Sequence, residues 1–532
     1  MTRKSFLQGA VILAAAGVFI KLLGAAFRIP LGNMIGDLGM SYYQTASHVY
    51  VVLLIIANTG IPVAISKMVS ERVAIGNYHE ANRVFKISFV LLLCIGLFSS
   101  SACFFGAKLI PRFVSVPEAV YSMQALAPAL LIVSMMAAFR GYFQGMQDMR
   151  LTAVSQSVEQ LFRVVCGLLL AYYFLGIKLE YASAGAAFGA SVGGIAGIIC
   201  AFVIYLKNRE RIRLKSTGYK IEDRERARSI LLKIIIISMP IIFGSAIMPI
   251  MNLIDLFMVV NVLESAGFTN EEAQRLFGQL AGFVGSLVNF PQVMAQAVAI
   301  SLVPTISMAH KQKDTAFMSD NIKLGVRAAM IIGLPCAFGY MVLSKPIMLL
   351  FYPLQKQSAI SAAEILLFMG AGVIFLSLFQ TLTGILQGIG KQLIPAINLA
   401  IGAVFKLFIS YKCISTPWIN VKGAAIGTVS AYIVAAALNM AAMIRHTKVK
   451  PDLRLTFGKP LLAAITMAAL VFCCYRLLFT IMGNAASTLL SIAFGALVYF
   501  FMILKLKAIT KEELAKLPKG RKLVKIVDWF VK

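Results

Sequence analysis

The sequence predicts an all-α integral membrane protein with about fourteen transmembrane helices. The chain of 532 residues is 59% hydrophobic and only 14% charged, whereas soluble domains hold about 45–50% apolar and about 25% charged residues. Its apolar residues also recur in runs of about 20, the length that a helix needs to cross a bilayer. The 40 glycines fit this class, because membrane helices approach one another closely through small residues.

Fourteen apolar runs follow one another along the chain, separated by polar or basic connections. Six precede a long basic connection, six follow it, and two more lie near the C-terminus. In order, they span residues 8–30, 42–66, 86–110, 120–143, 153–176, 182–206, 230–260, 278–304, 322–345, 360–386, 393–413, 422–445, 459–480 and 485–506.

Basic residues in the connections orient these spans, because Lys and Arg gather on the cytoplasmic side. With the N-terminus inside, the inner connections are the richer ones, and residues 207–228 alone hold nine basic and four acidic residues. Four cations fall on the outer side and count against this orientation: Lys108, Arg112, Lys345 and Lys356. On balance we expect both termini in the cytoplasm of a bacterial cell membrane.

The net charge of +28 points to anionic lipid headgroups and not to nucleic acid, because the chain has no aromatic-basic domain outside its apolar runs. The last 28 residues, from Lys505, hold nine basic residues. They predict either an amphipathic helix on the membrane surface or a solvated basic tail.

Catalytic and metal-binding patterns are absent from the sequence. The eight cysteines lie mostly singly in apolar runs, without the CxxC or Cys/His spacing of a disulfide framework or zinc site. The four histidines are scattered, and no nucleotide-binding Walker A motif occurs. We therefore expect no enzyme, no catalytic residue, no metal and no cofactor beyond a coupling ion.

An internal repeat divides the chain. The stretch RGYFQGMQDMRLTAVSQSVEQLFR at 140–163 corresponds to TGILQGIGKQLIPAINLAIGAVFK, 243 residues later. GAAFGAS at 185–191 corresponds to GAAIGTV at 423–429, and ISKMVSERV at 65–73 corresponds more weakly to LVPTISMAH at 302–310. Three pairs in the same order predict two homologous six-helix halves, related as a parallel repeat because six spans is an even number.

The repeat sets the expected domains. Residues 1–215 form an N-terminal six-helix lobe and residues 216–446 a C-terminal one. Residues 447–532 add helices 13 and 14 and the basic tail. In transporters built this way the substrate path lies between the lobes.

Two cations lie inside the first span, where charge is costly. Lys21 is about thirteen residues into the span, and Arg28 follows seven residues later. Seven residues make two helical turns, so both face one side about 10 Å apart. Two cations stacked on a cavity wall suit a diphosphate or another polyanion; snorkelling to the interface is the alternative, which fits Arg28 better than Lys21.

A polar stripe predicts part of the path in the fifth span. Thr152, Gln156, Glu159 and Arg163 are spaced by four, three and four residues, which places them on one helix face. Glu159 and Arg163 either neutralise each other as an i,i+4 pair or line a cavity. In the second half Gly402 replaces the acid, and Lys406 retains the positive charge.

Two further ionisable residues lie in or near the spans. Asp255, in the middle of the seventh span, is a candidate for binding a coupling H⁺ or Na⁺. Asn252, Asn398 and Thr428 are the candidate sources of further oxygen ligands. We expect Arg140 to snorkel or to gate the cytoplasmic mouth.

These residues carry a resemblance. The 140–163 string, with FRIPLGNMIG near the start and ILQGIGKQ later, resembles the polysaccharide-biosynthesis branch of the multidrug/oligosaccharidyl-lipid/polysaccharide exporter superfamily, near the stage V sporulation protein B group and the lipid II flippases. The resemblance implies two lobes that form a V around a central cavity opening alternately to each side. It also implies that basic residues of the first helix, here Lys21 and Arg28, line that cavity.

The resemblance further implies a lipid-linked oligosaccharide substrate, a polyprenyl-diphosphate sugar such as lipid II, moved from the inner to the outer leaflet. Membrane lipids and cell-wall synthesis proteins would be its partners. A cation-coupled multidrug exporter of the same fold and a non-transporting scaffold of cell-wall synthesis are the alternatives. The chain departs from lipid II flippases at LLIIANTGIP, residues 53–62, where those proteins often carry another Arg.

Overall fold

The computed structural model describes residues 3–216 and 225–508, and this part of the chain is helical, without strands. It contains twelve helices that are long and apolar enough to cross a membrane. Two of these, Phe19–Ala74 and Arg454–Lys505, are 56 and 52 residues long, or about 84 and 78 Å, far more than one bilayer crossing. Each contains a break and is long enough for two crossings, so the described residues provide about fourteen spans, which confirms the predicted fold class.

Each predicted span falls on a described helical stretch, to within four residues at its ends. The predicted surface helix or basic tail falls mostly on residues 509–532, and the basic connection includes residues 217–224; both segments lie outside the described residues. The major helices are α1 (Arg3–Ile55), α2 (Ile61–Ala74), α3 (Tyr78–Gly106), α5 (Val120–Gly145), α6 (Arg150–Leu175), α7 (Leu179–Ser216), α8 (Ala227–Ser265), α9 (Asn270–Phe277), α10 (Gly285–Gln312), α11 (Thr315–Val342), α13 (Lys356–Gly388), α14 (Leu393–Ile414), α15 (Lys422–Thr447) and α16 (Lys459–Lys505).

Shorter helices complete the described chain. Two are α-helices of one or two turns, three are π-helical and one is a 3₁₀ turn. They are α4 (Ile110–Phe113), α12 (Ser344–Phe351), η1 (Ile56–Gly60), η2 (Pro117–Ala119), η4 (Gly278–Val284) and η5 (Arg454–Gly458).

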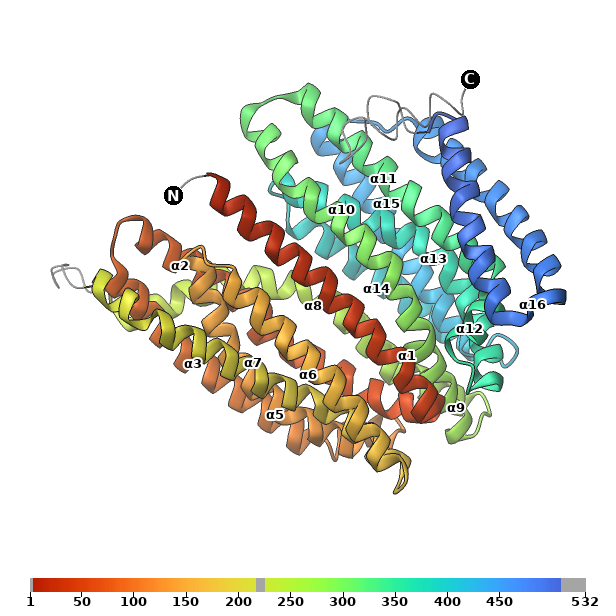
Figure 1. Cartoon of the computed structure of the whole chain (residues 1–532), viewed down its shortest axis with the longest axis horizontal. Helices are drawn as coiled ribbons and strands as arrows, with labels where there is room; N and C mark the ends of the chain where they lie inside the picture. The colour runs from red at the N-terminus through yellow and green to blue at the C-terminus, as the bar shows by residue number, and fades with distance from the viewer. Residues whose placement is uncertain (1–2, 217–224, 509–532) are drawn as a thin grey trace. The chain divides into compact units, whose positions relative to one another are not determined.

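Glycine marks the break in both long helices. Gly36 in α1 has φ 66° and ψ −171°, and Gly483 in α16 has φ 72° and ψ −177°. Glycine reaches positive φ without the steric cost that a Cβ would add. The two legs of α16 run antiparallel on either side of its break (Figure 1).

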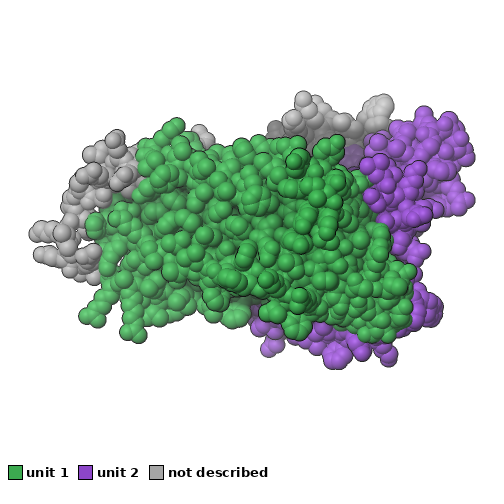
Figure 2. All heavy atoms as spheres, turned by 90° about the horizontal axis from the view of Figure 1, so that it is seen from below, with its two compact units in different colours: residues 1–286 green, residues 287–532 purple. Residues whose placement is uncertain are grey.

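The chain packs as two compact units, residues 1–286 and residues 287–532 (Figure 2). Helix α8 belongs to the first unit by packing, although the repeat assigns it to the second half. The division by packing therefore differs from the boundaries predicted at 215 and 446. Those boundaries follow sequence homology between the halves and stay predictions.

The two units share one pattern of helix packing. In the first unit α6 packs most extensively on α7, α7 also packs on α5, and α5 packs on α3. In the second unit α14 packs most extensively on α15, α15 also packs on α13, and α13 packs on α11. One pair in each unit touches only slightly: α5 with α6 in the first, and α13 with α14 in the second. The four-helix motif of the repeat is thus visible in the packing of each unit.

Glycine contacts repeat with the same register. A Cβ on Gly141 would lie 2.9 Å from the Pro62 carbonyl oxygen of α2, and one on Gly384 would lie 2.6 Å from the Ala299 carbonyl oxygen of α10. One turn later, Gly145 and Gly388 approach α2 and α10 in the same way. The Gln-Gly motif of each half therefore marks a point where two helix backbones must meet closely.

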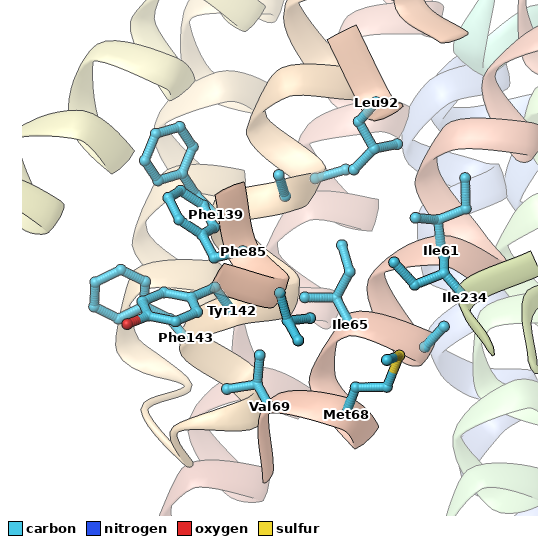
Figure 3. Close-up of a cluster of buried hydrophobic side chains, with 14 of the residues drawn as sticks. Ile61, Ile65, Met68, Val69, Phe85, Leu92, Phe139, Tyr142, Phe143 and Ile234 are labelled. Carbon is cyan, nitrogen blue, oxygen red and sulfur yellow. The ribbon is translucent and has the colours of Figure 1, made fainter. Parts of the chain in front are cut away.

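A buried aromatic cluster packs α2, α3 and α5 of the first unit together (Figure 3). Phe85 of α3 contacts Phe139 and Tyr142 of α5, with ring centroids 5.2 and 4.7 Å apart. Ile65 of α2 packs against the same cluster. Since Phe139 and Tyr142 flank Arg140 in the chain, this core fixes the helix segment that carries Arg140.

Candidate functional site

One face of α1 carries both predicted cations and lies against α6. Lys21, Gly24 and Arg28 are spaced by three and four residues, so they share a helix face. A Cβ on Gly24 would lie 3.9 Å from the side-chain nitrogen of Gln160 in α6. Lys21 is exposed and Arg28 is half-buried. The structure therefore directs this basic face toward the helix that carries the predicted polar stripe.

Arg163 of α6 lies at the contact with the second leg of α1. It is half-buried and interacts electrostatically with Tyr43, Tyr50 and Glu159. Both tyrosines are only 2% exposed, and the ring of Tyr43 lies 5.8 Å from that of Phe27 on the first leg. Arg163 thus occupies a polar, aromatic-walled position next to the basic face of α1.

Glu159 of α6 forms its ion pair with Arg140 of α5 and not with Arg163 of its own helix. Its Oε2 lies 2.7 Å from Nη2 of Arg140 in α5. Arg140 is 4% exposed and also donates a hydrogen bond from Nε to Ser155, at 3.2 Å. The prediction that Arg140 snorkels was wrong, because its guanidinium is buried between α5 and α6 and paired there, and the gating alternative stays a prediction.

The predicted stripe on α6 divides between two neighbours. Thr152 is 1% exposed and accepts a hydrogen bond from Gln144 of α5 at 3.2 Å. Glu159 also turns to α5, whereas Gln160 lies against α1 and Gln156 is half-buried. Thr152 therefore does not line a cavity, because it is buried against α5, whereas Gln156, Glu159 and Arg163 stay predicted site residues.

Glycines of α7 fix the backbone of α6 at this level. A Cβ on Gly193 would overlap the Glu159 carbonyl oxygen and approach Cβ of Arg163 to 3.0 Å. One turn on, a Cβ on Gly197 would lie 3.1 Å from Cβ of Glu159. In the second half the glycine lies on the other helix of the pair. A Cβ on Gly402 of α14, the position equivalent to Glu159, would lie 2.6 Å from the Ala431 carbonyl oxygen of α15. Both arrangements bring the two backbones equally close.

The candidates for an ion site are distributed over both units. Asp255 of α8 is half-buried and Asn252 is exposed. In the other unit Asn398 donates to Asn439 at 2.8 Å, and Thr428 donates to a carbonyl of its own helix. Among the described residues no group of three or more His, Cys, Asp or Glu side chains is arranged to hold a metal ion.

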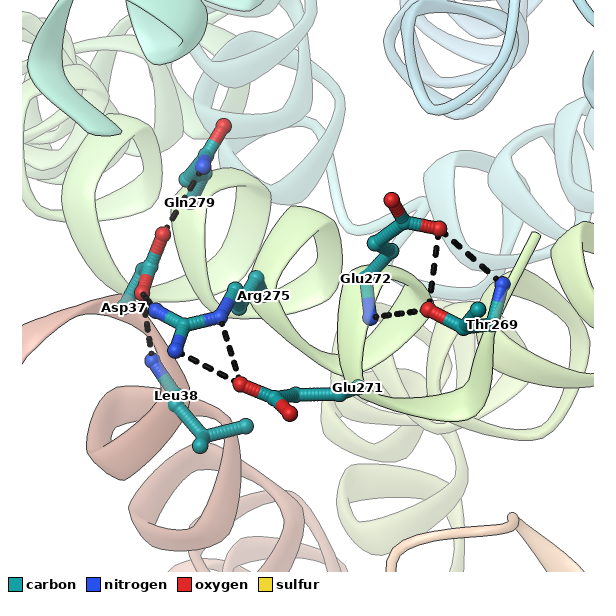
Figure 4. Close-up of polar contacts among 7 residues, drawn as sticks. All are labelled: Asp37, Leu38, Thr269, Glu271, Glu272, Arg275 and Gln279. Atoms are coloured by element: carbon teal, nitrogen blue, oxygen red, sulfur yellow. Dashed lines mark hydrogen bonds and ion pairs between the residues drawn. The ribbon is translucent and has the colours of Figure 1, made fainter. Parts of the chain in front are cut away.

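A polar cluster joins the bend of α1 to α9 (Figure 4). The Asp37 carboxylate accepts hydrogen bonds from Nη1 of Arg275 at 3.0 Å and from Nε2 of Gln279 at 2.9 Å. It also accepts a hydrogen bond from the Leu38 amide at 2.8 Å, and Arg275 pairs in turn with Glu271. The predicted topology places both segments on the outer side, and Asp37 and Gln279 lie 242 residues apart, close to the repeat offset.

Backbone contact accompanies this cluster. A Cβ on Gly278 would overlap the Asp37 carbonyl oxygen, and one on Gly282 would lie 2.8 Å from Cβ of Met40. Gln44 donates a hydrogen bond to the Ala281 carbonyl at 3.1 Å. Two glycines four residues apart thus let the second leg of α1 lie directly on η4, as small residues do between membrane helices.

At the predicted cytoplasmic side an acidic residue joins two helices. Glu225 pairs with Arg72, at the end of α2, and with Lys233 of α8 at 2.6 Å. Burial raises the pKa of the Glu225 carboxyl, but hydrogen bonds from Lys233 and Ser229 and the charges of Lys233 and Arg72 outweigh it, so the pKa lies below its ordinary value.

Sequence reasoning missed Tyr43, Tyr50, Gln160 and the Asp37 cluster. The spacing of the two tyrosines, seven residues or two turns, was an available signal. The contact of Asp37 with Arg275 was not, because it joins residues 238 positions apart on segments with no complementary motif.

Comparison with known proteins places this architecture. The profile of the polysaccharide biosynthesis protein family matches residues 6–310, more than half of the chain, and the MatE profile matches residues 280–412. From Bacillus subtilis, the uncharacterized membrane protein YabM is 29% identical over 98% of this chain and 96% of its own. Stage V sporulation protein B is 25% identical over 97% and 98%, and lipid II flippase MurJ is 27% identical over 83% and 82%.

Solved structures share the fold. The lipid II flippase MurJ in an inward closed conformation matches with a TM-score of 0.70 at 15% identity, over 92% of this chain and 98% of that one. An inward-facing MATE multidrug transporter matches with a TM-score of 0.64 at 16% identity, over 82% and 98%. The named relatives are transporters, flippases and sporulation proteins, in agreement with the expectation that the chain is not an enzyme. The chain is a multi-pass membrane protein and belongs to the polysaccharide biosynthesis protein family.

Proposed function

We propose that this protein is a flippase that moves a lipid-linked oligosaccharide, a polyprenyl-diphosphate sugar such as lipid II, from the inner to the outer leaflet. The observation that carries the proposal is the basic face of α1, Lys21 and Arg28, lying against the α6 segment with Gln160 and Arg163. Cations at this depth of a span are costly unless they serve a path or a ligand.

The chemistry of the headgroup fits these residues. A diphosphate carries concentrated negative charge, which lysine and arginine bind by charge-assisted hydrogen bonds. Gln156 and Gln160, which are both half-buried, offer amides to sugar hydroxyls. No covalent bond changes, since the headgroup crosses along protein while the prenyl chain stays in lipid.

Alternating access requires contacts that exist in one state and open in the other. We assign this role to the cluster around Asp37 and Arg275, which would close the outer end and part when the headgroup is released. The bacterial relatives support a bacterial membrane as the location, and we propose that both termini are cytoplasmic and that cell-wall synthesis proteins are partners. Asp255, with Asn252 beside it, remains our candidate for binding a coupling H⁺ or Na⁺.

A reconstituted flipping assay with a fluorescent undecaprenyl-diphosphate sugar tests the proposal. Lys21→Ala with Arg28→Ala should abolish flipping with unchanged yield and melting temperature, and Lys21→Arg should retain most of it. Lys178→Ala is the control, because this cation is exposed in the α6–α7 connection. Wild-type activity in the double variant would refute the assignment.

The MatE match over residues 280–412 favours one alternative, a cation-coupled multidrug exporter. Such exporters often carry cationic substrates, for which a path with available carboxylates is expected. Here Glu159 is held by Arg140. Efflux of cationic dyes without flipping of the diphosphate lipid would establish the exporter, and neither activity would favour the scaffold.

A further inference from the structure

The carboxylate of Glu159 has two arginines within reach. Arg140 approaches it across the α5–α6 contact, at 2.7 Å. Arg163 follows four residues later on the same helix and interacts with it electrostatically. An i,i+4 position is close enough for a direct ion pair. The structure shows the carboxylate in an ion pair with Arg140, and Arg163, whose other interactions are with Tyr43 and Tyr50, keeps its positive charge.

Arg140 is held so that this choice is fixed. Its Nε donates to Oγ of Ser155 at 3.2 Å, and Ser155 in turn donates to the Thr152 carbonyl at 3.3 Å. Its Nη2 also lies 3.2 Å from Sδ of Met136. One turn away Gln144 bonds to Thr152 and ties the same two helices together. The guanidinium therefore has little freedom to leave the carboxylate.

We propose that Arg140 is a specificity-determining residue of the transport path. By neutralising Glu159 it prevents this carboxylate from pairing with Arg163, and so keeps Arg163 available to an anionic headgroup. The inference rests on the proposed function, and it assigns Glu159 to the pair with Arg140 and not to contact with the substrate.

The second half of the chain supports this reading. The positions equivalent to Arg140, Ser155 and Glu159 are Thr383, Asn398 and Gly402, each 243 residues later. There the polar contact is neutral: Asn398 donates to Asn439 at 2.8 Å, and Asn439 donates to Thr383 at 3.4 Å. The acid and its arginine are absent together, whereas the cation equivalent to Arg163 is retained as Lys406. The arginine that neutralises a carboxylate thus occurs in the same half as that carboxylate.

Loss of Arg140 has a definite consequence. A buried carboxylate without its partner is unfavourable, so Glu159 would turn to Arg163. The site would then lose the positive charge of Arg163, the cation that it offers to the headgroup. Removing both members of the pair should restore Arg163, because no carboxylate remains to compete for it.

The test measures binding of a fluorescent undecaprenyl diphosphate to purified protein in detergent, and flipping of the corresponding sugar lipid in vesicles. Arg140→Gln should bind the diphosphate about tenfold more weakly, a difference of about 1.4 kcal/mol. Arg140→Lys and the double variant R140Q/E159Q should return to within about twofold of wild type, and Arg163→Gln should be weak in every background. Binding of glucosyl-diacylglycerol, which has a neutral headgroup, should be the same in all of them.

Control variants separate charge from folding. Asn439→Leu breaks the neutral contact in the second half and should lower the melting temperature without weakening diphosphate binding. If Arg140→Gln fails to fold, Ser155→Ala replaces it, because it loosens Arg140 while both charges stay; binding should then fall about threefold.

Four results would overturn the inference: unchanged binding in Arg140→Gln or in its substitute, failure of R140Q/E159Q to recover, wild-type binding in Arg163→Gln, or a wild-type protein that does not bind the diphosphate. A wild-type protein that binds the diphosphate without flipping the sugar lipid refutes the proposed function instead, and the binding series still decides the role of Arg140.

Discussion

Asp37 and Arg275 are joined at the point where α1 bends, with the arginine Nη1 3.0 Å from the Asp37 carboxylate. The two partners differ in environment, since the side chain of Asp37 is 3% exposed and that of Arg275 is 45% exposed. An exposed arginine adds little stability on its own. A buried carboxylate that also binds Gln279 and the Leu38 amide has much more to lose when a donor is removed.

Breaking this contact should open the predicted outer end. Asp37→Asn keeps the size of the side chain but removes the charge that holds Arg275. The Ala281→Cys variant places a thiol on the residue whose carbonyl Gln44 binds. We expect this thiol to react several-fold faster with an impermeant maleimide when Asp37→Asn is also present than when Asp37 is kept. Exposed Cys94 and Cys473 must be replaced first. Glu271→Gln, which removes the exposed partner of Arg275, is the control; equal labelling in both backgrounds would argue against a closing role.

Gly278 should not tolerate a side chain. A Cβ at this position would overlap the Asp37 carbonyl oxygen, which belongs to backbone and cannot rotate away. Gly278→Ala should therefore destabilise the fold by about 1–3 kcal/mol, as overpacking does. Gly339→Ala, with no atom within 4 Å of the new Cβ, should be neutral or stabilising by up to about 1 kcal/mol. Thermal unfolding followed by size-exclusion chromatography compares them, and equal melting temperatures would contradict the contact.

The repeat predicts equal sensitivity at equivalent glycines. Gly141 lies within 3.1 Å of Pro62 backbone, and Gly384 within 3.0 Å of Ala299 backbone, measured from an added Cβ. Gly141→Ala and Gly384→Ala should therefore lower the melting temperature by similar amounts. A large effect of one and none of the other would show that the two halves do not pack alike.

The contribution of Glu225 to stability should depend on pH. Its pKa in the folded protein lies below its ordinary value, mainly through Lys233 and Ser229 acting against the effect of burial. The stabilisation is therefore present above the ordinary pKa of 4.5 and is lost as the pH falls through the lower, folded value. The difference in melting temperature between wild type and Glu225→Gln should be constant near neutral pH and shrink in acid below 4.5. Arg226→Gln, at an exposed neighbour, should show no such trend.

Much of the fold was predictable because a membrane-spanning helix can be recognised from the length and hydropathy of its apolar run. Each predicted apolar run falls on a described helical stretch, to within four residues at its ends, and the sequence repeat corresponds to shared packing and shared glycine contacts. The candidate site was predictable in part. Spacing placed Lys21 and Arg28 on one face, and the contact of Gly24 with Gln160 shows where that face points.

Pairing was not predictable. The spacing of Glu159 and Arg163 indicated an ion pair on one helix, yet Glu159 turns to Arg140 on the neighbouring helix. Local spacing describes the neighbours that a helix supplies by itself, and it contains no information on which helix lies alongside.

The sequence by itself determined the membrane class, the number and order of spans, the two halves and the positions where charge enters the apolar runs. Only the tertiary structure decided which charges neutralise one another. Hydrophobic length and periodicity act within a single helix, so they can be read along the chain. The partner of a buried charge depends on which backbones approach closely, at glycines such as Gly193 and Gly278, and that is a property of the packed molecule.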